Sequence, residues 1–153
     1  MATIRLAGRQ AASSGAVIDN VAGSIWNPHA TARVILKEIH IANSVATVAH
    51  IGVKRTTTRG ATPAASFTAA IANTDQRDIV DPAGLALEVA GFGTQPAVEG
   101  SYIQRWAIPA AIGAGVMFVF ANPLTIPAGT GVAIVSATAL LTPIMDYTIV
   151  YEV

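Results

Sequence analysis

His40 and His50 are the residues of this chain whose spacing comes closest to metal-binding chemistry. Each lies in an apolar run, and a short loop at residues 44–46 would place the two imidazoles opposite each other on neighbouring strands. A zinc site needs three or four ligands, and only Glu38 and His29 lie near enough in the sequence to add one. We therefore favour packed or interface histidines, with a metal site as the alternative, and we expect no cofactor.

Asp75, Asp78 and Asp81 carry the hard oxygen ligands that calcium prefers. Their spacing is not that of an EF-hand loop, which needs a glycine at its sixth position and a glutamate at its twelfth. We favour an acidic, turn-forming loop, with calcium binding as the alternative.

Catalytic groups are no better supported. Glu88 and Glu99 could act as the two carboxylates of a glycosidase, but a sandwich contains such pairs by chance. The chain has no cysteine, which excludes thiol nucleophiles, and it has no Gly-x-Ser-x-Gly elbow. The Gly129-Thr130-Gly131 segment lacks the third glycine of a dinucleotide loop. We predict that the protein is not an enzyme.

Charge excludes some partners. Nine basic and nine acidic residues give a net charge of zero, so the chain lacks the attraction that non-specific binding to nucleic acid requires. Lys54, Arg55 and Arg59 form the one basic cluster, which we interpret as a solvated strand end, with docking to an acidic protein as the alternative. We expect no nucleic-acid partner.

The composition is unusually apolar for a chain of 153 residues, with 52% hydrophobic and 12% charged residues. Average soluble domains contain about 25% charged residues. A single domain of this size has a limited interior, so we expect part of the apolar excess to be buried in subunit interfaces. The sequence thus indicates a protein that assembles with itself.

The segment from 106 to 145 contains no Asp, Glu, Lys, Arg or His, yet prolines and glycines interrupt it repeatedly. A membrane helix needs about 20 consecutive apolar residues without such breaks. We therefore predict short apolar strands and no membrane partner.

Strand signals dominate the rest of the chain. Residues 34–42 and 45–53 read as an antiparallel hairpin, with Ile35, Lys37, Ile39 and Ile41 on one face of the first strand. Further strands are predicted at 85–90, 101–108, 115–121, 131–137 and 146–153. We predict an all-β fold, a jelly-roll-like antiparallel β-sandwich over residues 33–153, preceded by an extended N-terminal arm.

The predicted arm, residues 1–32, is rich in Ala, Gly and Ser and shows no sustained apolar period. A frayed terminus is the alternative. Trp26 favours a docking arm, because an aromatic of this size is wasted on a mobile tail. Arg5 and Arg9 lie in the same segment, and no apolar run there has the length of a signal peptide.

Three segments, 32–43, 123–135 and 146–153, resemble in layout the small jelly-roll virion proteins of tailed bacteriophages, with a Pro-Ala-Gly turn before the penultimate strand. Capsid decoration, or cement, proteins are the nearest group. The resemblance implies a homotrimer on the capsid exterior that clamps neighbouring copies of the major capsid protein.

If the protein is a decoration protein, one set of residues would form the subunit interface and another would bind the capsid. The subunit interface would be lined by apolar strand residues, namely Val34 and Leu36, or Val116, Phe118 and Phe120. The arm would lie across the capsid through Arg5, Arg9 and Trp26.

Two other function classes remain open. A receptor- or glycan-binding module of a phage tail or fibre would use loop aromatics, for which Phe92, Tyr102 and Trp106 are the candidates. An enzyme on a cupin-like roll would need a histidine cluster, which this chain lacks.

Overall fold

The computed structural model describes residues 3–9, 17–61, 65–68, 86–89, 92–139 and 143–152. Ten strands are assigned in these ranges. Their bounds are β1 (Thr3–Arg9), β2 (Val21–Trp26), β3 (Val34–Asn43), β4 (Ala49–Thr56), β5 (Ala65–Thr68), β6 (Ala86–Val89), β7 (Gln104–Ile108), β8 (Gly115–Ile126), β9 (Gly131–Ser136) and β10 (Met145–Glu152). The described ranges contain no helix with the length and hydrophobicity to span a lipid bilayer.

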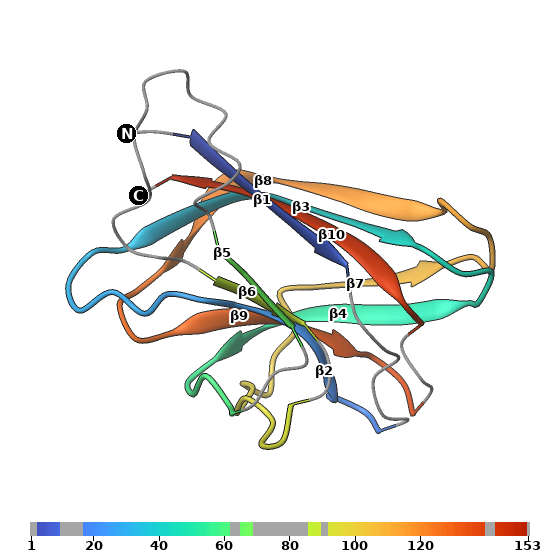
Figure 1. Ribbon diagram of the computed structural model, residues 1–153, viewed down its shortest axis with the longest axis horizontal. Coiled ribbons are helices and arrows are strands. Elements are labelled where there is room, and N and C mark those ends of the chain that lie inside the picture. Colours follow the sequence, from blue (N-terminus) through green and yellow to red (C-terminus); the bar gives the residue numbers. More distant parts are fainter. Residues whose placement is uncertain are drawn as a thin grey trace.

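The strands form two antiparallel sheets packed face to face, which confirms the predicted β-sandwich (Figure 1). Sheet A has the order β1-β10-β3-β8, and sheet B has the order β5-β6-β2-β9-β4-β7. The pairing is nested along the chain: β1 pairs with β10, β2 with β9, β3 with β8 and β4 with β7. The first half of the sandwich is therefore built against the second half.

The main core lies between the sheets, where alternate residues of each strand point inward. In β10, Tyr147, Ile149 and Tyr151 are buried. In β9, all six residues are buried, because this strand has cover on both faces. That cover explains why the sequence of β9 is apolar without alternation.

A bulge in β3 overturns the predicted assignment of its faces. Leu36 pairs with Tyr151 and Glu38 with Val150, so Lys37 is the extra residue on this strand. The inward set changes parity at this residue, with Leu36 before it and Ile39 after it buried. The prediction assumed a strict period of two and was wrong beyond the bulge.

The predicted hairpin of 34–42 and 45–53 was also wrong. The two strands exist as β3 and β4, but β3 lies in sheet A and β4 in sheet B. The connection crosses the sandwich, so the turn residues do not set a shared register. His40 and His50 consequently lie in different sheets.

The predicted extended arm is replaced by strands. Residues 3–9 form β1 at the edge of sheet A, and residues 21–26 form β2 inside sheet B between β6 and β9. Trp26 is 9% exposed and belongs to the core, so it is not a docking residue. The sandwich therefore begins before residue 33.

A covering segment, residues 92–103, packs on the outer side of sheet B. Phe92 is buried against Val21 and Val135, and Tyr102 packs against the same cluster. Gly52 in β4 makes room for this cover, because an added Cβ would lie 2.4 Å from the Tyr102 ring.

Candidate assembly surface

The edge strand β8 carries exposed apolar side chains on the outer face of sheet A. Met117 is 67% exposed and Val119 is 55% exposed. They pair with His40 and Glu38 of β3, which fixes both on the outer face. Ile112, in the turn before β8, is 74% exposed.

The inner side of β8 is apolar as well. Val116 and Phe120 pack against the core, and Phe118 is partly buried beside them. The ring of Phe118 meets Trp106 of β7 edge to face at 5.5 Å, and it meets Phe120 at 4.7 Å. These aromatics line the side of the sandwich where β7 and β8 are the edge strands.

The other three sheet edges are protected in ways that β8 is not. β1 carries Arg5 and Arg9, and β7 carries Arg105. β5 has only four residues. β8 has 12 residues without a charge, although Pro123 interrupts its second half. Natural sheets use charge, proline or short length to prevent edge pairing, so the first half of β8 is the unprotected edge.

Ion pairs occupy the outer face of sheet A over β1, β10 and β3, and the contact between His40 and Glu38 lies directly beside β8. Arg9 donates two hydrogen bonds to Asp146, at 2.6 and 3.0 Å, and Lys37 pairs with Glu152. The Arg9 hydrogen bonds hold the pKa of Asp146 below its ordinary value, and the Lys37 hydrogen bond does the same for the pKa of Glu152. The outer face is thus polar over β1 and β10 and apolar at β8.

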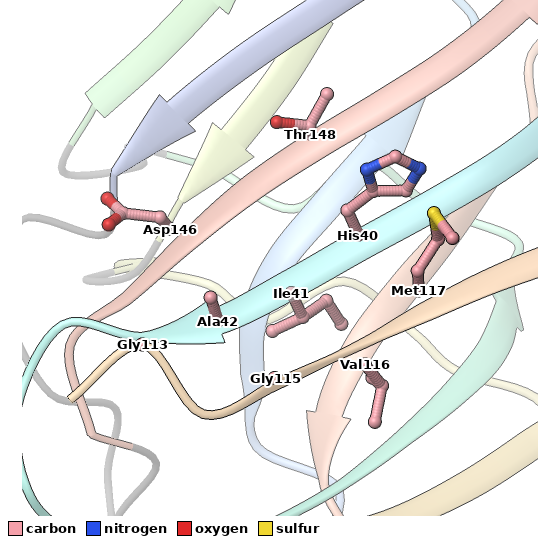
Figure 2. Close-up of a pocket in the computed structure, with 9 residues that line it drawn as sticks. All are labelled: His40, Ile41, Ala42, Gly113, Gly115, Val116, Met117, Asp146 and Thr148. Atoms are coloured by element: carbon pink, nitrogen blue, oxygen red, sulfur yellow. The ribbon is translucent and has the colours of Figure 1, made fainter. Parts of the chain in front are cut away.

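A shallow hollow of about 320 Å³ lies beside Met117 on this face (Figure 2). Ala42 and Gly115 are among the residues that line it, and an added Cβ at Gly115 would lie 2.3 Å from the carbonyl oxygen of Ile41. Figure 2 shows His40 and Met117 standing on the same side of the strands, above Ile41. The hollow is open to solvent. Asp146, the carboxylate among its lining residues, is ion-paired with Arg9.

The candidate metal ligands do not converge in the described part of the chain. His40 contacts Glu38 at 2.8 Å, and the His29 ring accepts a hydrogen bond from the Ala32 backbone at 2.8 Å. No group of three His, Asp or Glu side chains there is placed to hold a metal ion. Asp75, Asp78 and Asp81 lie outside the described residues.

The proposed carboxylate pair does not share a cleft. Glu88 is buried on β6, where Arg59 donates two hydrogen bonds to one of its oxygens at 2.8 and 2.6 Å. Glu99 is exposed beyond the end of β4. Each carboxylate therefore has its own surroundings.

The residues of the basic cluster have different surroundings, and the prediction that they are all solvated was wrong for Lys54. Its Nζ is buried, lies 2.7 Å from Asp19 and sits 4.2 Å from the centre of the Tyr102 ring. Arg105 covers the ring at 4.7 Å, and the Tyr102 hydroxyl donates to Asp19. Burial, with this hydrogen bond, raises the pKa of Tyr102. Arg55 donates to the Thr125 carbonyl.

The structure separates the two predicted interface sets. Val34 and Leu36 are fully buried between the sheets, so they cannot contact another subunit. Val116, Phe118 and Phe120 lie together on β8, partly exposed. Sequence reasoning missed their neighbours, which are Ile112, Met117 and Val119. Their apolar character was visible, but only the sheet order reveals that this strand lies at an edge.

The arginines assigned to the arm lie on β1 instead. Arg5 and Arg9 are exposed on the outer face of sheet A, and Arg9 is paired with Asp146.

Comparison with protein-family models, with curated proteins and with solved structures found no match.

Proposed function

We propose that this protein is a structural virion subunit, a capsid decoration or cement protein that associates with itself and stabilises the lattice of the major capsid protein. The observation that carries the proposal is the uncharged edge strand β8, with Met117 and Val119 exposed. A soluble protein that presents such an edge needs a partner to cover it.

The nested strand pairing supports the jelly-roll form of this proposal. Jelly rolls are double-sheet folds of eight strands and two Greek keys. Here the eight strands β1 to β4 and β7 to β10 pair first with last and inward along the chain, while β5 and β6 extend sheet B beyond β2. This is the arrangement expected when a long antiparallel ribbon wraps into two sheets.

The candidate carboxylates Glu88 and Glu99 have separate surroundings, so they lend no support to a glycosidase. A glycan-binding role has less support, because the three aromatic candidates are engaged. Phe92 is buried, Tyr102 lies between Lys54 and Arg105, and Trp106 packs on Phe118.

Binding to capsids tests the proposal. Purified protein is mixed with shells of the major capsid protein from the same virus, and the bound fraction is measured by co-sedimentation. We expect saturable binding to the exterior and a higher melting temperature of the shells. Shells of an unrelated phage are the control. No binding, or equal binding to both shells, would overturn the proposal, and selective retention on a glycan array would favour the tail-module alternative.

A further inference from the structure

We propose that the edge of β8 pairs with β8 of a second copy, so that two four-stranded sheets join into one continuous sheet across a two-fold axis. This inference rests on the proposed function, since it supplies the self-association that a structural subunit needs. The pairing uses residues 115–119, which form a regular strand with β3 from Gly115 opposite Ala42 to Val119 opposite Glu38.

The second half of β8 sets the limit of this pairing. The register with β3 shifts after Val119, and the next paired residue, Leu124, lies opposite Leu36. Pro123, inside the shifted part, has no backbone N–H to donate. The free edge is therefore the regular segment 115–119, on one side of the register shift.

Apolar side chains on both faces of β8 point to a strand as its occupant. Met117 and Val119 are exposed on the outer face, and Phe118 is only partly buried on the inner face. A partner laid on the outer face alone would leave Phe118 partly in water. A strand added to the edge covers both faces and also satisfies the free backbone groups.

Charge favours a second copy of this chain. In an antiparallel pair of identical strands related by a two-fold axis, a residue at the axis meets its own copy, and like charges placed opposite each other are destabilising. β8 has no charged residue, whereas the exposed edges β1 and β7 carry arginines that would repel their own copies. The zero net charge of the chain removes long-range repulsion between copies.

Such an interface is isologous and closes at two copies. The expected dimer therefore differs in mass from the trimer that the family resemblance implies, and the two can be separated directly.

Light scattering of the full-length protein, over a wide concentration range, gives the first test. We expect a dimer for the wild type and a monomer for Met117→Lys, because two lysines would meet near the axis. Met117 is exposed, so this variant is expected to fold, which circular dichroism checks. Ala7→Lys is the matched control, since Ala7 is exposed on the opposite edge of the same sheet, and it should remain a dimer.

Mixing charge variants gives the second test. Met117→Lys and Met117→Glu should each be monomeric alone and should form a mixed dimer together, because opposite charges then meet across the axis. A monomeric or trimeric wild type, a dimeric Met117→Lys, or a mixture that stays monomeric would each overturn the strand pairing.

The outcomes separate this inference from the proposed function. A trimer that binds capsid shells overturns the β8 pairing and supports the capsid role. A dimer that depends on β8 but does not bind shells supports the pairing and overturns the capsid role.

Discussion

Lys54 is a cation held inside the protein, and its charge is balanced within the chain. Its side chain is 3% exposed, while that of its partner Asp19 is 34% exposed. Asp19→Asn removes the counter-charge, and asparagine tolerates the backbone φ of 64° at this position. We expect the free energy of unfolding to fall by about 2 kcal/mol, less than for a fully buried pair because water reaches Asp19. Urea unfolding measures the change.

The matched control for this prediction is Asp146→Asn. Asp146 also pairs with a cation, Arg9, but the two side chains are 45% and 66% exposed. Exposed pairs contribute little to stability, because water screens their charges. Equal losses for the two variants would contradict the view that burial of Lys54 makes its charge costly to leave unpaired.

The buried phenol of Tyr147 should make the free energy of unfolding decrease at alkaline pH. Burial, with the nearby charge of Asp146, raises the pKa of this phenol in the folded state. An unfolded chain releases the phenol proton near pH 10, while the folded chain keeps it. Above that pH the unfolded state binds fewer protons than the folded state. The contribution of the Tyr147 phenol to the free energy of unfolding is therefore complete below about pH 10. It is lost as pH rises, by about 1.4 kcal/mol per pH unit.

Alkaline unfolding, followed by tyrosinate absorbance and circular dichroism together, measures this loss. Tyr147→Phe should flatten the decline of stability above about pH 10. Ionisation of Tyr147 without loss of the folded signal would contradict the prediction.

The strands β1 and β2 change what an N-terminal deletion is expected to do. A detachable arm could be removed without harm, but deletion of residues 1–28 removes both strands, including one from the interior of sheet B. We expect this variant to lose cooperative unfolding, because β9 would lose its hydrogen-bonded neighbour β2 and keep only β4. Deletion of residues 1–16 removes the edge strand β1, with the buried Ile4 and Leu6, but keeps β2, and it should leave a folded but less stable protein. Near-ultraviolet circular dichroism and thermal unfolding compare the two, and a fully stable first variant would contradict this role for β2.

Strand positions were predictable where turns mark them, and less so elsewhere. β9 follows Pro127 and Gly129, β10 follows Pro143, and both strands were predicted within a residue or two. β2 was missed because it is buried on both faces and contains Gly23 and Ser24, so it shows neither alternation nor a continuous apolar run. The bulge at Lys37 could not be predicted from the spacing of apolar residues, because it is defined by the register with the partner strands.

At the scale of the whole molecule, the excess of apolar residues lies partly in the interior and partly at an exposed sheet edge. The composition alone cannot distinguish these two locations. The uncharged segment from 106 to 145 contains β9, which is buried within the subunit, and β8, which is exposed at an edge. Sequence reasoning named Val116, Phe118 and Phe120 of β8, but it named the fully buried Val34 and Leu36 with equal weight. Only the order of strands in the sheets distinguishes an interior strand from an edge.

The nested strand pairing also governs how this chain reaches its fold. Thr3 hydrogen-bonds Glu152, 149 positions away, and among the described strands only β5 and β6 pair with a neighbour in the chain. Local hairpins therefore contribute little to nucleation, and such topologies fold in about milliseconds to seconds rather than microseconds. While the chain folds, its uncharged segment, residues 106–145, stays exposed to water. Refolding then competes with aggregation, so its yield depends on protein concentration as well as on temperature.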